Sequence, residues 1–233
     1  TASDGLVKIR LSDDGKKAAL VEVNCETDFA ARDENFVAFT ETVIGQVYDA
    51  GSGDVQALLD AGLEATREAV VQKIGENISV RRAEVLDITE GQLASYVHSN
   101  GKIAVLVNIS GGNDELAKDV AMHIAATNPL VISGDDMPED VVAKEREIYT
   151  AQAQDSGKPA EIVEKMIDGR IRKFLSENSL VDQPFVKDAD TKVGKLLQQH
   201  DASILSFVRY EVGEGIEVEE VDFAAEVAAQ LGQ

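Results

Sequence analysis

The chain has 233 residues and a formal net charge of −21, because 22 lysines and arginines face 43 aspartates and glutamates. A surface this acidic repels phosphate backbones and anionic lipids, so direct contact with nucleic acid or a membrane is not expected. The 44% hydrophobic content is that of an ordinary globular protein, and the sequence has neither an export signal nor an apolar run near the ~20 residues that span a bilayer.

A single cysteine, Cys25, excludes an internal disulfide framework and a cysteine-based zinc site. This usage fits a reducing compartment, and we expect a cytoplasmic protein. Cys25 stands beside Glu26 without a basic neighbour, which predicts an inert thiol. The sequence begins at Thr1 and enters a predicted strand at once, which indicates a piece of a longer protein.

Two β-hairpins are predicted, one in each half of the chain. Asp14-Gly15 and Asn100-Gly101 each lie between β-rich runs, and both dipeptides favour a tight two-residue turn. When the two glycines are aligned, a lysine and several apolar residues on the following strands also match, at a separation of 86 residues. The match indicates a duplicated unit.

A helix follows each hairpin, with apolar residues at three- and four-residue spacings in residues 36–47 and 116–125. Aligning the helix starts, Glu34 with Asp114, reduces the separation from 86 to 80, so the first copy has six additional residues between strand and helix. They fall within "NCETDFAAR" at 24–32, whereas the second copy uses little more than "SGGN". The fold therefore does not require the additional loop, and such loops often carry binding residues.

Phe29 is the large apolar residue of this additional loop, next to Asp28 and two alanines. A ring flanked by small residues can project far from the backbone and contact a partner. A loop aromatic can equally fold back as a lid on its own core. Spacing alone leaves both positions open.

The first half continues with a predicted helix over residues 63–74, closed by Gly75, and a strand over 78–87. In the second half, residues 139–176 have strong helical periodicity that is interrupted by "SGKP", which predicts a protruding antiparallel helical hairpin. A helix and a strand over residues 193–212 then complete the second sheet.

These elements predict an α+β fold of two related half-units, each a small antiparallel sheet with helices packed on it, plus the inserted helical hairpin and a C-terminal helix. The predicted domains are residues 1–88, residues 89–212 with the hairpin at about 139–176, and residues 213–233. The last segment begins in an acidic stretch, with seven acidic and no basic residues at 211–226. It favours a solvated turn and a capping helix; alternatively Phe223, Val227 and Leu231 form an apolar stripe that docks on a partner.

The motifs of covalent catalysis and phosphate binding are missing. No Gly-Lys pair is followed by serine or threonine, and neither a zinc-protease helix nor a nucleophile elbow occurs. His123 lies on the apolar face of a predicted helix and is expected in or near the core, whereas His98, beside a hairpin turn, is a candidate contact residue. We therefore predict no enzyme activity, no metal site and no cofactor.

The stretch "VEVNCETDFAARDENF" at 21–36 resembles the signature of the translation elongation factor Ts family. Further segments resemble the family in the same order: "QKIGENISVRR", "AMHIAATNP", "SGKPAEIVEKMIDGRIRKF", "LVDQPFV" and "FVRYEVGEGIE". The resemblance extends from Gly5 to the C-terminus. Two differences are apparent: the family's N-terminal helical module, which binds the partner's nucleotide domain, is not in this sequence, and Ala30 stands where the family usually has valine.

The resemblance implies a guanine-nucleotide exchange factor that acts on elongation factor Tu in translation elongation. By motif, four residues correspond to the element that dislodges magnesium from the partner: Thr27, Asp28, Phe29 and Ala30. Three others correspond to contacts with the partner's nucleotide-binding domain: Ile74, Gly75 and His98. Residues 223–229, with Phe223 and Val227, correspond to a C-terminal module that returns to that domain.

The resemblance also implies that the second half grips the third domain of Tu, and that two exchange factors can assemble with two Tu molecules. The residues leave two other functions open. A non-catalytic acidic scaffold that only holds Tu or another protein, such as a polymerase subunit, would associate without faster nucleotide release. A hydrolase using Asp28 with His98 would lack a nucleophile.

Overall fold

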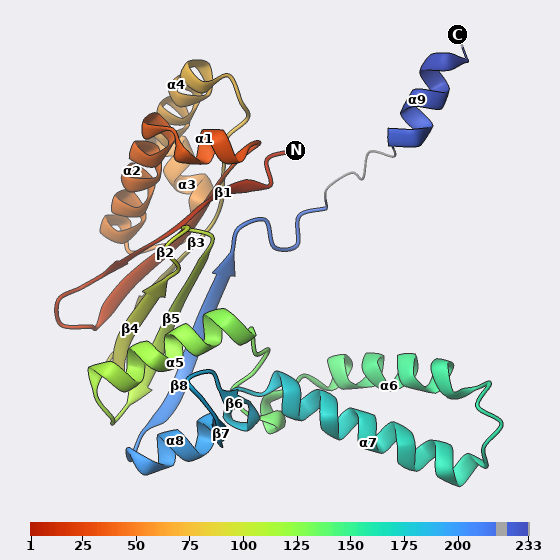
Figure 1. Cartoon of the computed structure of the whole chain (residues 1–233). Helices are drawn as coiled ribbons and strands as arrows, with labels where there is room; N and C mark the ends of the chain where they lie inside the picture. Colours follow the sequence, from red (N-terminus) through yellow and green to blue (C-terminus); the bar gives the residue numbers. More distant parts are fainter. Residues whose placement is uncertain (218–222, 233) are drawn as a thin grey trace.

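The computed structural model describes residues 1–217 and 223–232. Two three-stranded antiparallel sheets form the centre of the molecule (Figure 1). The first has the order β1 (Asp4–Leu11), β2 (Lys17–Cys25), β3 (Ser79–Asp87), and the second the order β4 (Gln92–Val97), β5 (Ile103–Ser110), β8 (Ser203–Glu211). The predicted α+β fold of two related half-units is confirmed.

Helices cover the outer faces of the two sheets. The first half contains α1 (Asp28–Arg32), α2 (Glu34–Ala50), α3 (Val55–Leu58) and α4 (Glu64–Ile74). The second half contains α5 (Asp114–Thr127), α6 (Glu139–Ala153), α7 (Ala160–Asn178) and α8 (Val193–Gln199), and α9 (Phe223–Leu231) lies near the C-terminus. A small hairpin of β6 (Pro184–Phe185) and β7 (Asp188–Lys192) was not predicted from the sequence. Within the described part of the chain, no helix is both long enough and apolar enough to cross a membrane.

The central strand of each sheet is buried on both faces, which explains its apolar runs at residues 18–21 and 103–107. Along β2, Val21 and Val23 pack in the core of the first half with α2, while Ala18 and Leu20 face the second sheet. The strand β5 repeats this alternation, and its Leu106 meets Leu20 in the cluster between the sheets. The molecule therefore has four layers in the order helices, sheet, sheet, helices.

The two hairpin turns are alike but longer than predicted. The Ser12 N–H donates to the Lys17 carbonyl at 2.8 Å, and the His98 N–H donates to the Ile103 carbonyl at 2.9 Å. Four residues, rather than two, therefore lie between the last paired residues of each hairpin. The predicted two-residue turns are wrong.

The reason lies in the side chain before each glycine. A two-residue turn of the predicted type needs positive φ at both central residues, but here only Gly15 and Gly101 have it, with φ of 67° and 72°. Asp14 and Asn100 instead accept hydrogen bonds from the N–H two residues later, at 3.0 and 2.9 Å. These local bonds hold the wider loop.

Each turn docks on the opposite half of the molecule. The carbonyl of Gly101 accepts from the Val7 N–H at 2.9 Å, and the carbonyl of Gly15 accepts from the Leu93 N–H at 2.8 Å. Val7 and Leu93 are 86 residues apart, as are Gly15 and Gly101, so each half makes the same contact with the other. The duplicated units therefore face each other with approximate two-fold symmetry.

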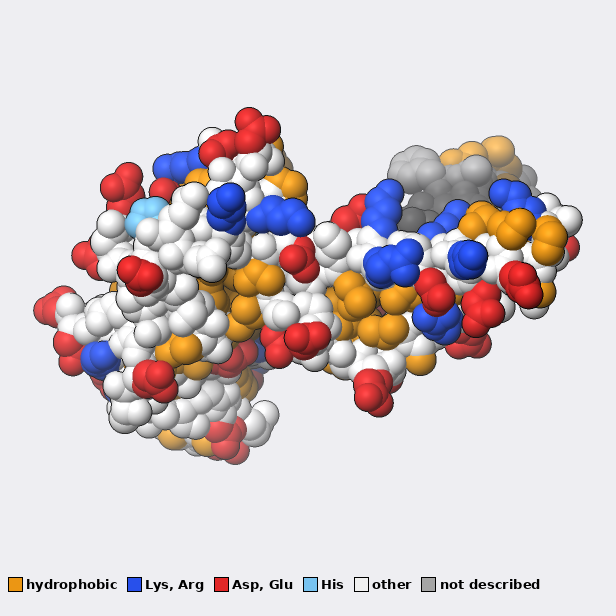
Figure 2. Space-filling view, turned by 90° about the horizontal axis from the view of Figure 1, so that it is seen from below, with side chains coloured by type: hydrophobic (Ala, Val, Ile, Leu, Met, Phe, Trp, Pro, Cys, Tyr) orange, Lys and Arg blue, Asp and Glu red, His pale blue; other side chains and the backbone are white. Residues whose placement is uncertain are grey.

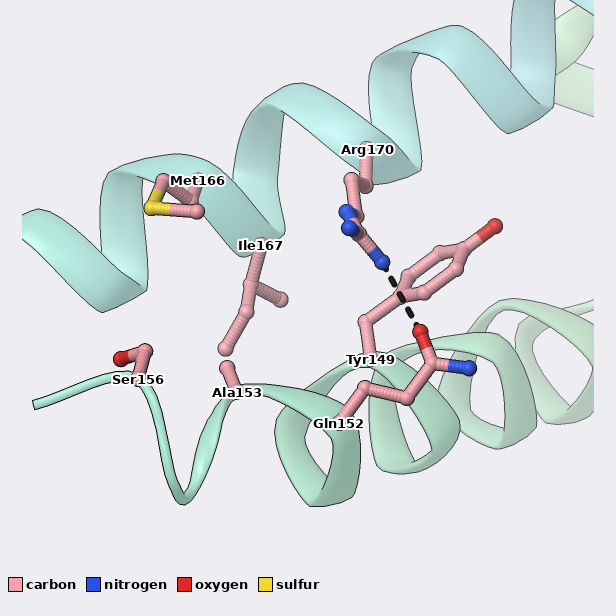
Figure 3. Close-up of a pocket in the computed structure, with 7 residues that line it drawn as sticks. All are labelled: Tyr149, Gln152, Ala153, Ser156, Met166, Ile167 and Arg170. Atoms are coloured by element: carbon pink, nitrogen blue, oxygen red, sulfur yellow. Dashed lines mark hydrogen bonds between the residues drawn. The ribbon is translucent and has the colours of Figure 1, made fainter.

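The helices α6 and α7 form the predicted antiparallel hairpin, which projects from the second half (Figures 1 and 2). Between them, Arg170 Nη1 donates to Gln152 Oε1 at 2.8 Å, and the guanidinium lies 5.5 Å from the centre of the Tyr149 ring (Figure 3). Hydrophobic side chains reach the hairpin surface (Figure 2), among them Ile162 and Met166.

Candidate partner-binding site

Much of the additional segment of the first half is helical rather than a loop. Thr27 precedes α1, and its Oγ1 accepts a hydrogen bond from the Ala30 N–H at 3.2 Å. Asp33 ends α1 and begins α2, because its N–H donates to the Ala30 carbonyl while its carboxylate accepts from the Asn35 N–H at 2.8 Å. Both ends of this five-residue helix are thus capped.

The helix α1 has a buried face and an exposed face. Ala30 and Ala31 are only 4% and 2% exposed and belong to the core of the first half. Phe29 is 76% exposed. The small methyl groups let the helix lie close on the core, so the ring projects into solvent, which answers the question that the sequence left open.

Ala30 therefore differs from the other residues grouped with it by motif. Its side chain is inside its own protein, so it anchors α1 rather than offering a surface to a partner. Because Ala30 is buried, the difference between this alanine and the valine usual in the resembling family affects how α1 packs on its own core. Thr27 is half-buried at the cap, and Asp28 and Phe29 are the exposed members of the group.

Charged groups surround the exposed ring. The Arg32 guanidinium lies 5.3 Å from the centre of the Phe29 ring, and one of its nitrogens is 3.4 Å from the Asp28 carboxylate. Because all three side chains are exposed, these contacts contribute little stability. One turn of helix thus presents an apolar ring, a carboxylate and a guanidinium together.

A carboxylate from a distant segment holds the start of α1. Glu76 Oε1 accepts from the backbone N–H groups of Glu26 and Thr27, both at 3.0 Å, and Glu76 Oε2 accepts from Thr27 Oγ1 at 2.6 Å. Sequence reasoning did not select Glu76. Its only signal was its position directly after Gly75 in a segment that carried the family resemblance.

Glu76 also brings together two groups of predicted contact residues. The helix α4 ends at Gly75, which has φ of 80° and donates to the Val71 carbonyl at 2.7 Å. Gly75 is exposed, and Ile74 is half-buried against the core of the first half. Through Glu76, this helix end lies next to the start of α1.

His98 lies in the exposed turn between β4 and β5, where its Nδ1 accepts from the Asn100 N–H at 3.3 Å. Lys102, in the same turn, places its Nζ 2.7 Å from the Asp4 carboxylate. Asp4 is the sheet partner of Cys25, the last residue of β2 before the segment that leads into α1. His98 and α1 are therefore attached to the same end of the first sheet.

Two other residues singled out from the sequence have structural roles. Cys25 is buried, and burial raises the pKa of its thiol to about 12, as expected for an inert thiol. His123 is also buried, as expected, and burial lowers its pKa against the opposing hydrogen bond with Gln183. Its Nδ1 accepts from the Val186 N–H at 3.2 Å, so Nε2 donates to Gln183 Oε1 at 2.9 Å.

The predicted C-terminal helix is present as α9, and Val227 on it is 46% exposed. Phe223 begins this helix, but its side chain lies outside the described residues. Contact with a partner by either residue stays a prediction.

A duplicated scaffold that carries an exposed aromatic ring on a capped helical turn is typical of a protein-interaction module. Comparison with known proteins agrees with this class. A family model described as Elongation factor TS matches residues 26–214. The chain therefore belongs to the elongation factor Ts family, and with it to the factors of translation elongation.

Individual relatives are similar over nearly the whole chain. The elongation factor Ts of Hahella chejuensis is 61% identical over 230 residues, which cover 99% of this chain and 80% of that protein. The protein of the same name from Teredinibacter turnerae is 56% identical over 232 residues, covering 99% and 79%. That of Marinobacter nauticus is 55% identical over 232 residues, covering 100% and 80%.

Proposed function

We propose that this chain is a guanine-nucleotide exchange factor for elongation factor Tu, which accelerates GDP release without covalent chemistry. The observation that carries the proposal is the exposure of Phe29, 76%, on a helix whose two alanines are buried. An exposed ring gains almost nothing within its own chain. Its burial in a partner would contribute about 1.5–3 kcal/mol.

The proposed mechanism acts on the magnesium site of Tu. GDP is held mainly through its phosphates, by backbone N–H groups of a glycine-rich loop and by Mg²⁺. Phe29 inserts beside the ion, and the burial of its ring offsets the strain that the insertion imposes. Without the ion, the loop must neutralise the phosphate charge alone, so GDP dissociates faster.

Asp28 adds a negative charge at the same edge of the partner site. It competes with carboxylates and waters of Tu for hydrogen bonds rather than binding the metal. Among the described residues its carboxylate has one exposed polar contact, 3.4 Å from Arg32, which costs little to break. Thr27 and Ala30 support this surface without contacting Tu: Thr27 caps the start of α1, and Ala30 packs α1 on the core.

The energetics of exchange require a difference in affinity. The factor binds nucleotide-free Tu more tightly than GDP-bound Tu. By linkage, GDP lowers the affinity of the factor for Tu by the same factor by which the factor lowers the affinity of Tu for GDP. A protein with equal affinity for GDP-bound and nucleotide-free Tu would not shift the equilibrium between these two states, however tightly it bound.

Other surfaces complete the proposed complex. Ile74, Gly75 and His98 contact the nucleotide-binding domain beside α1, and the C-terminal module at 213–233 returns to it with Phe223 and Val227. The half-unit at 1–88 thus addresses the nucleotide site, while the half-unit at 89–212 binds the third domain of Tu. We further propose a two-plus-two assembly in the cytoplasm, without direct contact to nucleic acid or membrane.

Stopped-flow release of a fluorescent GDP from purified Tu tests this function. We expect release to accelerate with the wild-type chain, to lose about 10-fold or more of that acceleration with Phe29→Ala, and to keep it with Glu41→Ala. Glu41 is a suitable control because its side chain is 60% exposed on α2 and it is none of the proposed contact residues. Binding without acceleration would favour the scaffold, and an unimpaired Phe29→Ala would remove the assigned role of the ring.

A further inference from the structure

We propose that Glu76 is a positioning residue of the exchange reaction, which fixes the orientation of Phe29 through the start of α1. This inference rests on the proposed function. Glu76 lies outside the segment that carries the ring, 47 positions along the chain from Phe29, and has no direct contact with it among the described hydrogen bonds and ion pairs. It acts through Thr27.

The helix α1 depends on its ends for its orientation. A single five-residue turn has no stability of its own, since even good helix formers need about 12–15 residues to be helical in water. Glu76 satisfies the N–H groups of Glu26 and Thr27, which lead into the helix and have no intrahelical acceptor. Its negative charge also suits the positive end of the helix.

The hydroxyl of Thr27 connects Glu76 to the helix backbone. It donates to Glu76 Oε2 at 2.6 Å and accepts from the Ala30 N–H at 3.2 Å. Because the carboxylate can only accept, it fixes the direction of the hydroxyl proton and leaves an oxygen lone pair directed at Ala30. The cap of α1 is therefore set by a carboxylate from another segment.

Glu76 is itself held on both sides by α4. Gly75 ends that helix, and two residues after Glu76 the Ile78 carbonyl accepts from Arg67 Nη1 at 2.8 Å. Arg67 Nε donates in turn to Glu64 Oε2 at 2.8 Å. Glu76 and its three hydrogen bonds to Glu26 and Thr27, which we call the Glu76 clamp, are thus attached to a helix end that is itself held in place.

Without the hydrogen bonds from Glu76, the Phe29 ring would sample more orientations before binding. Fixing one orientation would then cost conformational entropy, and this cost would lower the rate of productive insertion. Three hydrogen bonds are lost in Glu76→Ala, so we expect the acceleration of GDP release to fall by about 5- to 20-fold. Glu76→Gln should retain most of it, because the amide oxygen still accepts from both N–H groups and the amide nitrogen can donate to Thr27 Oγ1.

A double-mutant cycle separates positioning from general stability. Release of fluorescent GDP from Tu is measured with wild type, Phe29→Ala, Glu76→Ala and the double variant, and with Glu41→Ala as a control carboxylate that pairs with Lys8 on the surface. We expect Glu76→Ala to slow release when Phe29 is present and to have almost no further effect in the Phe29→Ala background. Glu41→Ala should match wild type.

Two results would overturn the assignment of Glu76 alone: full activity of Glu76→Ala, or an equal loss in both backgrounds, which would indicate a merely structural role. An unimpaired Phe29→Ala would instead overturn the proposed role of the ring, and this inference with it. If Glu76→Ala does not fold, Thr27→Val removes the bridging hydroxyl at constant shape. The same Phe29-dependent loss is expected there, and full activity of Thr27→Val would contradict the proposal.

Discussion

The two halves of the molecule join the same strand to the same helix in different ways. In the second half, β5 ends at Ser110 and α5 begins at Asp114, with Gly111 and Gly112 between them at φ of 74° and 71°. In the first half, the longer connection contains the whole of α1. The second half shows that this unit closes without α1, so the exposed ring of the first half is better explained by function than by folding.

The short connection is possible because its backbone packs very closely. A Cβ atom on Gly111 would lie 2.2 Å from the Asp201 carbonyl oxygen, which only glycine avoids. The long connection instead places Ala30 and Ala31 in the core and holds its start with Glu76. The comparison teaches that one site can be stabilised by its inward face while its outward face remains free to bind.

The largest effect is expected from a charge on the inward face of α1. Ala31 is 2% exposed, so Ala31→Asp would bury an unpaired carboxylate and reduce the free energy of unfolding by about 2–4 kcal/mol. Urea unfolding followed by circular dichroism measures this loss, with Asp28→Ala as the exposed control. A change below about 0.5 kcal/mol would mean that α1 is not anchored as described.

A second difference between the halves lies within their central strands. Glu22 of β2 corresponds to Asn108 of β5, 86 residues later, and both are buried. The Glu22 carboxylate accepts hydrogen bonds from Asn24, Arg81, Arg82 and the Gly213 N–H. Burial opposes its ionisation, but the bonds from Asn24, Gly213 and Arg82 outweigh that effect and lower the pKa of Glu22.

Because its pKa is lower in the folded state, Glu22 stabilises the protein above its ordinary pKa of 4.5, and this contribution is lost as the pH falls below that value and through the lowered one. Glu22→Gln makes the first half resemble the second. We expect a loss of about 2 kcal/mol at neutral pH, since Arg81 and Arg82 lose a charged partner but retain access to water. Urea unfolding between pH 7 and pH 4 should show a flatter pH dependence than wild type; an identical profile would contradict this role.

The smallest effect is expected at the short connection. Gly112→Ala combines an unfavourable positive φ with a close contact to the flexible end of the Leu116 side chain, which can move aside, and should lower the free energy of unfolding by about 1–2 kcal/mol. The folded fraction should still accelerate GDP release at the wild-type rate. Slower release per folded molecule would show that exchange is not confined to the α1 side as proposed.

Much of this arrangement was predictable from sequence patterns. The duplicated hairpins, the helical hairpin and the position of the additional segment followed from local periodicity and from counting residues between the two copies. The helical form of α1 did not, because five residues carry no periodic signal. The role of Glu76 was also hidden, since its partners Glu26 and Thr27 are 50 and 49 residues away and only the folded sheet brings them together.

The hairpin turns show a different limit. Asp14-Gly15 and Asn100-Gly101 predict a turn correctly but not its length. The same dipeptides fit a two-residue turn and a four-residue loop, and the hydrogen bonds of the Asp14 and Asn100 side chains stabilise the longer one. The small hairpin of β6 and β7 was missed for a related reason: its strands are too short, at two and five residues, for alternation to be recognised.

The central claim is that Phe29 leaves solvent for a pocket of Tu, and hydroxyl-radical footprinting of the complex tests it most directly. In the free chain the ring is 76% exposed and should be oxidised readily. In the complex with nucleotide-free Tu, we expect strong protection of Phe29, while Tyr48, half-buried on α2 and outside the proposed contacts, keeps its labelling. Equal oxidation of Phe29 in the free and bound chain would contradict the account.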